Sequence, residues 1–238
     1  MKYMGSKNRI VNDILPIILK QRKQNQWFVD MFCGGCHVIQ YVDGKKIAND
    51  KNKYLIAMWK GLQENRNRPK IIEKELYSRA RTEYNNGINI DFDDFMIGWI
   101  GWMASYNGRF FDGGYSGHDV TTSHRDYISE QIRNTEEQIK YLTDVKFFSK
   151  EYFEFEFKEP CLIYCDIPYK DTKQYATSRD FNYDKFFDWC RKMAKNGHTM
   201  FVSEYQAPDD FICVWEKEIT NSMNQKKTYK PIERLFTI

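Results

Sequence analysis

The sequence contains no apolar run of about 18 residues, the length that a membrane-spanning helix requires. Its first residues also lack the apolar core and the cleavage pattern of a signal peptide. Internal repeats and low-complexity tracts are absent as well, and 42% of the 238 residues are hydrophobic. Such a composition supports an extensive core rather than general disorder. We therefore expect no membrane partner, and a chain that forms one large domain or one core with an inserted subdomain.

Cysteine is scarce, and its spacing matches neither a disulfide framework nor a complete zinc site. Cys33 and Cys36 form one close pair, but the other cysteines provide no second pair at the spacing of zinc ligands. Most of the cysteines lie in apolar stretches. The sequence therefore favours buried free thiols in a reducing cytosol over half of a zinc site. We expect a cytoplasmic protein without a metal.

Charge of one sign is not in large excess either, because the net charge is only +3. Its distribution is more informative. Residues 1–26 contain six basic side chains and a single acidic one, Asp13. This local excess suits a surface that faces phosphates, and a merely solvated basic terminus is the alternative.

A short apolar run, 160–164, precedes the most informative stretch of the chain, Asp166-Ile167-Pro168-Tyr169. The run is typical of a buried strand, and Pro168 ends it in a rigid turn. The carboxylate of Asp166 and a neighbouring backbone carbonyl are two acceptors, which match the two N–H donors of an exocyclic amino group. The ring of Tyr169 can stack on a flat heterocycle. An ordinary turn at a strand end is the alternative that this stretch alone leaves open.

A second pattern lies near the N-terminus, where a predicted strand, 27–32, is followed by Gly34-Gly35. A further short strand, 45–48, then leads to Asp50. This order is typical of nucleotide binding on a Rossmann-like sheet, because glycines let the backbone approach the ligand and a carboxylate accepts hydrogen bonds from ribose hydroxyls. No G-x-G-x-x-G motif is present, so a simple turn followed by a surface aspartate stays open.

The remaining periodicities outline an α/β chain. We expect a first helix over 8–15, which Pro16 ends or kinks. Helical patterns dominate from 54 to 143. Later elements are predicted at 145–149 (strand), 181–194 (helix), 198–203 (strand), 211–219 (strand) and 234–238 (strand).

The helical region contains a long loop, which runs from Ser105 to Arg125 and is rich in Gly, Tyr, Asp, Thr and His. Loops of this length inside compact domains are usually functional or mobile. Asn107, Arg109, His124 and Arg125 carry groups that bind base edges and phosphates. We therefore expect this loop to recognise the sequence of a nucleic acid. The alternative is that the loop packs on its own aromatic side chains.

Several segments, taken in order, carry a family resemblance. They are 2–7 (aromatic-x-Gly-x-Lys), 28–36 (similar to F-V-E-P-F-x-G-x-G), 48–50, 166–169 (similar to D-P-P-Y, continued by Thr172 and Tyr175), 201–205 and 233–236. With these motifs the chain resembles the Dam family of DNA adenine-N6 methyltransferases. The resemblance covers about 1–60 and 145–238, and between them only 106–108 matches a family pattern. Two residues depart from it, since Ile167 replaces a proline and Cys36 replaces a glycine.

The resemblance implies an S-adenosylmethionine-dependent enzyme with a Rossmann-like α/β sheet that methylates N6 of adenine in double-stranded DNA. Residues 1–54 and 146–238 would form the catalytic domain, and 55–145 an inserted, mainly helical target-recognition subdomain. No obligate protein partner is evident. The implied catalytic residues are Asp166, Ile167, Pro168 and Tyr169. The implied cofactor contacts are Tyr3, Lys7, Asp30, Phe32, Gly34, Gly35, Asp50 and Asp166.

In the implied mechanism, Asp166 and the carbonyl of Ile167 accept the hydrogens of the adenine amino group while Tyr169 stacks on the flipped base. Isoleucine supplies that carbonyl as well as proline does, so we expect an active enzyme. Two other functions stay open at this point. One is a catalytically weak DNA-binding module of the same fold, and the other is a methyltransferase acting on a small molecule or a protein glutamine.

Overall fold

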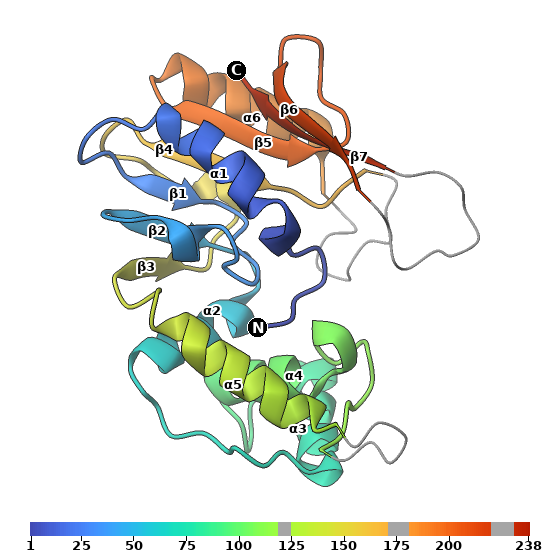
Figure 1. Cartoon of the computed structure of the whole chain (residues 1–238). Coiled ribbons are helices and arrows are strands. Elements are labelled where there is room, and N and C mark those ends of the chain that lie inside the picture. Colours follow the sequence, from blue (N-terminus) through green and yellow to red (C-terminus); the bar gives the residue numbers. More distant parts are fainter. Residues whose placement is uncertain (119–124, 171–180, 220–230) are drawn as a thin grey trace.

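The computed structural model describes residues 1–118, 125–170, 181–219 and 231–238. Seven strands form one sheet in the order β3-β2-β1-β4-β5-β7-β6 (Figure 1). Their bounds are β1 Phe28–Asp30, β2 Lys46–Asn49, β3 Val145–Phe148, β4 Leu162–Asp166, β5 Thr199–Glu204, β6 Ile212–Glu218 and β7 Ile232–Thr237. Strands β1 to β5 pair in parallel, whereas β7 is antiparallel to β5 and β6. The predicted Rossmann-like α/β sheet is confirmed.

Both faces of the central part of the sheet are apolar, because alternate residues of β1 and β4 enter different cores. In β1, Phe28 packs in the cluster that contains helix α1 (Val11–Lys20), whereas Val29 packs in the cluster that contains helix α6 (Tyr183–Lys195). The same alternation separates Tyr164 from Cys165 in β4. The two helices therefore cover opposite faces of the sheet, which leaves the strand ends for polar side chains.

The expected first helix ends later than the sequence indicates. Helix α1 continues through Pro16 to Lys20, and a 3-10 turn, η1 (Lys7–Arg9), precedes it. Proline removes one backbone donor, but the helix buries Ile14 and Leu15 before that position and Ile18 after it. Burial of a continuous apolar face therefore outweighs the local cost of the proline. Of the two effects expected of Pro16, an end or a kink of the helix, the end is wrong and the kink stays a prediction.

The chain between β2 and β3 is mainly helical and lies beside the sheet (Figure 1). Its helices are α2 Lys53–Gln63, α3 Lys74–Asn86, α4 Asp94–Ala104 and α5 Tyr127–Ile139, with a 3-10 turn η3 at Tyr106–Gly108. Helices α2 and α4 touch through glycines: a Cβ on Gly98 would lie 2.1 Å from the Tyr54 carbonyl oxygen, and one on Gly61 2.2 Å from the Phe95 ring. This close crossing joins the helices to the core of the first sheet face.

Two further 3-10 turns, η2 (Ile39–Tyr41) and η4 (Tyr152–Glu154), complete the described elements. In the described part of the chain, no helix combines the length and the apolar character needed to cross a membrane.

Candidate active site

The site lies where the strand order changes direction, between β1 and its neighbour β4. Open parallel sheets bind ligands at the carboxyl ends of the strands that flank such a point. Here β1 ends at Asp30 and β4 ends at Asp166, while Asp50 follows the end of neighbouring β2. The fold therefore gathers three of the predicted acidic residues at one edge of the sheet.

Lys7 completes this edge from the N-terminal turn. Its Nζ atom lies 2.7 Å from Oδ1 of Asp166 and 4.5 Å from the centre of the Tyr169 ring. The side chain of Lys7 is only 9% exposed. Lys7 is thus a buried partner of the turn Asp166–Tyr169. It does not belong to the phosphate-facing surface that the basic N-terminus suggests.

Burial and the ion pair act in opposite directions on the two charges. Burial raises the pKa of Asp166 to about 6, although Lys7 lowers it. Burial alone would lower the pKa of Lys7, but the carboxylates of Asp166 and Glu233 together raise it. Near neutral pH, Asp166 is therefore ionised and Lys7 is protonated, and the carboxylate is ready to accept hydrogen bonds.

The turn Asp166–Tyr169 is fixed by contacts with α6 and with the end of β5. The side chain of Ile167 is 2% exposed and packs in the core beneath α6, where the departure from proline gains apolar contacts. The hydroxyl of Tyr183 donates to the Pro168 carbonyl over 2.9 Å. Beyond the turn, the Lys170 N–H donates to Oε1 of Glu204 over 2.7 Å. These contacts hold the backbone of the turn without using the side chain of Asp166.

Glu204 is buried at the end of β5 and was not assigned a role from the sequence. Its second oxygen accepts the Tyr205 N–H over 2.7 Å, and burial raises the pKa of the carboxyl to about 7. The only signal in the sequence is a charged residue at the end of an apolar strand. Such a residue is as common on a surface as it is in a buried anchor, so the pattern could not assign it.

The glycine-rich turn after β1 is tied to Asp50. The Gly34 N–H donates to Oδ2 of Asp50 over 3.1 Å, and the Asn52 N–H donates to Oδ1 over 2.9 Å. Nearby, Oδ1 of Asp30 is buried and has no hydrogen-bond partner among the described residues. Asp50 thus shapes the turn, and each of its oxygens retains a further lone pair for a ligand donor.

Tyr3 lies directly on this turn and explains why the turn contains glycines. A Cβ on Gly34 would lie 2.7 Å from the Tyr3 ring, and one on Gly35 would lie 2.7 Å from Cβ of Tyr3. The ring of Tyr3 also stacks on Trp102 of α4, with the ring centres 5.0 Å apart. A side chain at either glycine would therefore displace the N-terminal segment from the turn.

The predicted contact Phe32 lies apart from these residues. Its ring packs against Tyr152 and Phe186, with centre distances of 5.8 Å to each, in the core beneath α6. The cysteines of the same turn, Cys33 and Cys36, are buried free thiols, and burial raises the pKa of both. Among the described residues, no group of three or more His, Cys, Asp or Glu side chains is arranged to hold a metal ion.

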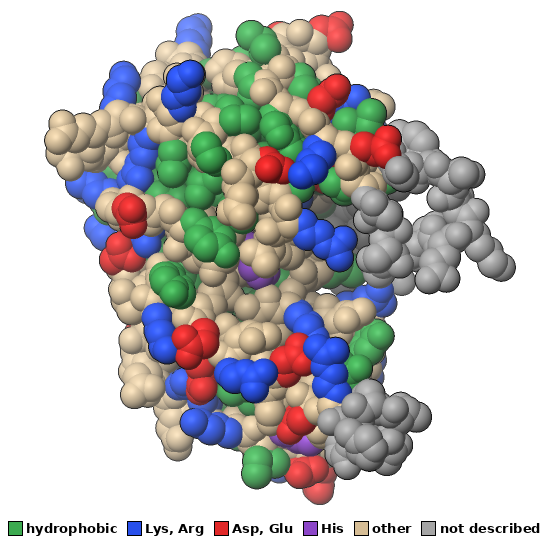
Figure 2. Space-filling model, in the orientation of Figure 1, with side chains coloured by type: hydrophobic (Ala, Val, Ile, Leu, Met, Phe, Trp, Pro, Cys, Tyr) green, Lys and Arg blue, Asp and Glu red, His purple; other side chains and the backbone are tan. Residues whose placement is uncertain are grey.

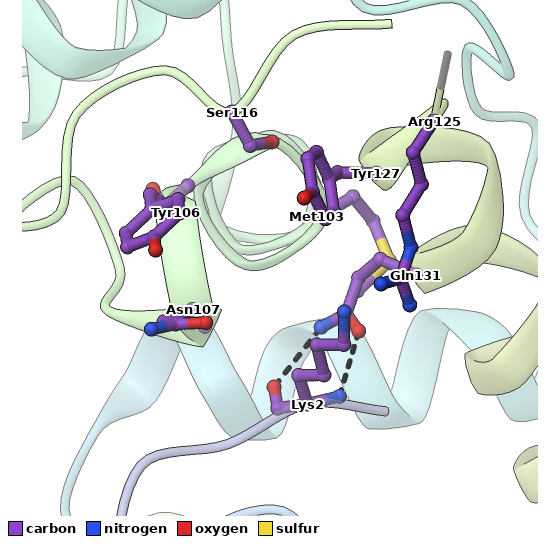
Figure 3. A pocket seen from close by; sticks show the side chains of 10 residues that line it. Lys2, Met103, Tyr106, Asn107, Ser116, Arg125, Tyr127 and Gln131 are labelled. Carbon is purple, nitrogen blue, oxygen red and sulfur yellow. Dashed lines mark hydrogen bonds between the residues drawn. The ribbon is translucent and has the colours of Figure 1, made fainter. Parts of the chain in front are cut away.

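A second feature, a pocket of about 230 Å³, lies between the N-terminal segment and the helices (Figure 3). Lys2, Tyr106, Asn107, Arg125 and Gln131 are among the residues that line it. Gln131 exchanges two hydrogen bonds with the backbone of Lys2, since the Lys2 N–H donates to Oε1 over 2.6 Å and Nε2 donates to the Lys2 carbonyl over 3.0 Å. The pocket is therefore built from two distant parts of the sequence.

The four residues predicted to bind DNA have different positions relative to this pocket. Asn107 is exposed at its edge, with a left-handed backbone (φ 53°). Arg125 also lines it, and donates to both oxygens of Glu130 over 2.6 and 2.8 Å. Arg109 is partly buried and is not among the lining residues. His124 lies outside the described residues.

Figure 2 shows Lys and Arg side chains interspersed with Asp and Glu over the helical segment, and several basic side chains of the protein have acidic or backbone partners. Lys2 lies 3.0 Å from Glu130, and Arg68 lies 3.1 Å from Glu136. Arg22, from the basic N-terminus, donates to backbone carbonyls, including that of Asp43 over 2.6 Å. Attraction of phosphates to this face would therefore require these partners to be shared or exchanged.

Comparison with known protein families gives one finding that covers nearly the whole chain. A family described as D12 class N6 adenine-specific DNA methyltransferase matches residues 3–230. Comparison with curated proteins gives no match. The matched range includes Lys7, the glycine-rich turn, Asp50 and the turn that begins at Asp166.

Proposed function

Because the chain belongs to the D12 class N6 adenine-specific DNA methyltransferases, we propose that the residues around Asp166 methylate an adenine that has left the stack of double-stranded DNA. The family confirms the expected activity, methyl transfer to N6 of adenine in DNA, and the expected methyl donor, S-adenosylmethionine. The roles of individual residues, the double-stranded form of the substrate and the flipped base are the proposal.

The observation that carries the proposal is the 2.7 Å ion pair between Lys7 and Asp166 at the sheet edge. The lone pair of an adenine amino group is delocalised into the ring, which makes the nitrogen a poor nucleophile. Hydrogen bonds from its two N–H groups to Asp166 and to the carbonyl of Ile167 favour a localised lone pair. Lys7 keeps Asp166 ionised and therefore able to accept, and Tyr169 provides an aromatic surface for the base.

Proton balance gives Asp166 a further task. Adding a methyl group to the neutral amino nitrogen gives a cationic nitrogen with two protons, and one proton must leave to give neutral N6-methyladenine. The pKa of Asp166, which burial raises to about 6, makes its carboxylate a better acceptor than an ordinary aspartate. We assign the first acceptance of this proton to Asp166, followed by release to solvent.

The residues on the β1–β2 side fit the cofactor that the family uses. When bound, S-adenosylmethionine supplies an electrophilic methyl group on a sulfonium. Its ammonium and ribose hydroxyls are donors, and the unpartnered Oδ1 of Asp30 and the remaining lone pairs of Asp50 are acceptors. We assign Asp30 to the ammonium and Asp50 to the ribose, with Gly34 and Gly35 providing close backbone approach. Tyr3, Lys7 and Phe32 are proposed as further contacts.

The pocket between Lys2 and Arg125 supports a role of the helical segment in target recognition. It combines a lysine, an arginine, an exposed asparagine and an exposed tyrosine, a set that suits phosphates, base edges and stacking. We therefore propose 55–145 as the target-recognition subdomain and 1–54 with 146–238 as the catalytic domain. The buried free thiols support the proposal that the protein acts in a reducing cytoplasm.

The test is methyl transfer from radiolabelled S-adenosylmethionine to mixed-sequence DNA, offered as duplex and as single strands. We expect label at N6 of adenine in the duplex, and loss of at least 99% of it in Asp166→Ala, with DNA association largely retained because phosphate contacts dominate it. No transfer by the folded wild-type protein, or label on a small molecule or a protein glutamine instead, would overturn the proposal.

A further inference from the structure

Glu233 lies on the strand that departs from the parallel sheet. Strand β7 is antiparallel, so its first residues reach the edge at which β4 and β5 end; Arg234 pairs with Glu204 in register. Glu233 shares a face of the sheet with Leu235, which packs in the core with Tyr164. Only 4% of the surface of Glu233 is exposed. A carboxylate in such a position needs partners, because an unpaired buried charge is strongly destabilising.

Two partners of Glu233 among the described residues come from the proposed active site, and both contact the same oxygen. The hydroxyl of Tyr169 donates to Oε1 of Glu233, and Nζ of Lys7 lies 3.3 Å from that atom. Lys7 in turn lies 2.7 Å from Asp166. One carboxylate oxygen therefore connects the aromatic ring of Tyr169 to the ammonium of Lys7, which lies 4.5 Å from the centre of that ring.

We propose that Glu233 is a positioning residue for methyl transfer, which orients Tyr169 and Lys7 around Asp166 without touching either substrate. The inference rests on the function proposed above and extends it to β7, near the end of the chain. The hydroxyl contact fixes the rotation of the Tyr169 ring, whose centre also lies 4.6 Å from that of Tyr205. The charge contact sets how Lys7 is shared between two carboxylates.

The negative charge of Glu233 and the length of its side chain can be changed separately. Among the described residues, the groups that act electrostatically on Asp166 or feel its charge include Lys7 (η1), Asp30 (β1), Tyr164 and Cys165 (β4), Tyr169 (turn), Glu204 (β5) and Glu233 (β7). The negative charge of Glu233 raises the pKa of Asp166. Removing that charge should therefore move the acidic limb of activity to lower pH. Shortening the side chain while keeping the charge should disturb Tyr169 and leave that limb in place.

The experiment compares Glu233→Gln, Glu233→Asp, Tyr169→Phe and the double variant Glu233→Asp/Tyr169→Phe in the radiolabel assay, with kcat, KM and pH profiles. We expect Glu233→Gln to lower kcat about tenfold and to move the acidic limb down by about half a pH unit. Glu233→Asp should lower kcat by a similar factor with an unmoved limb. The double variant should be no worse than about twofold below the poorer single variant, because shortening Glu233 and removing the Tyr169 hydroxyl break the same hydrogen bond.

Glu83→Gln is the matched control. Glu83 is also buried, but it accepts the N–H groups of Ile90 and Asp91, over 3.0 and 2.9 Å, within the helical segment. We expect it to lower the melting temperature while kcat and the pH profile stay unchanged. Thermal melting and calorimetric binding of S-adenosylmethionine establish that each variant is folded, and Glu233→Asp carries the test if Glu233→Gln does not fold.

Wild-type kcat and an unmoved acidic limb in folded Glu233→Gln would overturn the inference, as would fully multiplicative losses in the double variant. Wild-type kcat in folded Glu233→Asp would also overturn it. These results are distinct from failure of the proposed function, in which the wild-type protein itself transfers no methyl group to DNA.

Discussion

Lys7 and Asp166 form a buried ion pair, with Nζ and Oδ1 2.7 Å apart, although one residue lies in the N-terminal turn and the other at the end of β4. In the proposed mechanism, the pair places a cation on the carboxylate that accepts the hydrogens of adenine and must therefore remain ionised. Burial opposes that ionised state by raising the pKa of Asp166 to about 6. We therefore expect Lys7 to set the lower limit of the pH range in which the enzyme works.

Lys7→Gln should move this limit upward. Without the ammonium, burial and the charge of Glu233 act on Asp166 unopposed, so its pKa rises above 6. Activity requires the ionised form and is lost as the pH falls through the pKa. We expect the acidic limb of kcat/KM near pH 6 in the wild type and at least about one pH unit higher in the variant. A pH profile between 5 and 9 measures both, and an acidic limb that stays in place would contradict the role of the ion pair.

Asp50→Ala and Asp50→Asn should separate cofactor binding from turn structure. Alanine removes the acceptor for the Gly34 and Asn52 N–H groups as well as for a ligand, whereas asparagine keeps one acceptor oxygen. Loss of a charge-assisted acceptor is worth roughly 1.5–3 kcal/mol, so affinity for S-adenosylmethionine should fall about 10- to 100-fold in both variants. Calorimetry gives the affinity, and thermal melting should show the larger destabilisation in alanine. Unchanged affinity in folded Asp50→Asn would exclude Asp50 as a ribose contact.

Cys36→Gly should be nearly neutral for stability. Cys36 is fully buried with φ of 57°, a left-handed conformation that costs a side-chain residue about 1–2 kcal/mol. Glycine relieves this cost and loses the burial of a small apolar group, worth about 1 kcal/mol. We expect urea unfolding to change by less than about 1 kcal/mol in Cys36→Gly and to fall by more than about 2 kcal/mol in Cys36→Val, whose β-branch is incompatible with that backbone.

Ile167→Pro should affect stability more than turnover. The catalytic role needs only the backbone carbonyl, which both residues have, so we expect kcat to change by less than about tenfold. The isoleucine side chain is 2% exposed, and a proline ring replaces only part of its packing, which should cost about 1 kcal/mol or more. Turnover and urea unfolding of the same preparation test both parts. Activity that appears only in Ile167→Pro would show that isoleucine blocks catalysis.

Arg125→Ala should weaken DNA binding and reduce its salt dependence. Arg125 lines the pocket beside Lys2, and it is exposed and paired with Glu130. If it exchanges this partner for a phosphate, the slope of log affinity against log salt should fall by about one. Arg66→Ala is a suitable control, because Arg66 is likewise exposed and paired, with Asp93 at 2.6 Å, and does not line the pocket. Equal salt slopes in wild type and Arg125→Ala would place the contact elsewhere.

The strands and the order of motifs could be predicted from the sequence because they depend on local patterns. A short apolar run and a turn-forming Pro168 were enough to place β4 and the turn after it. The end of helix α1 could not be predicted, because Pro16 opposes the helix locally and only the burial of Ile18 against the sheet reverses that preference.

The charged contacts of the site required the three-dimensional structure for a different reason. Glu204 and Glu233 look like surface residues in short mixed segments, and nothing local indicates that they meet the turn at Lys170 and Tyr169. Lys7 was assigned to the cofactor from the resemblance, and only the fold places its ammonium on Asp166. Such contacts depend on strand order, which periodicity does not specify.

Helix α5 holds the N-terminal segment at two points on one face, seven residues apart. Gln131 bonds the Lys2 backbone, and Gln138 donates to the Gly35 carbonyl over 2.7 Å and accepts the N-terminal ammonium of Met1 over 2.6 Å. A helix is stiff over this span of about 10 Å. We therefore expect that a displacement of α5 by DNA would move the glycine-rich turn and the N-terminal segment that carries Lys7. Thermodynamic linkage then requires reciprocity: if DNA binding changes the affinity for the cofactor by some factor, cofactor binding changes the affinity for DNA by the same factor.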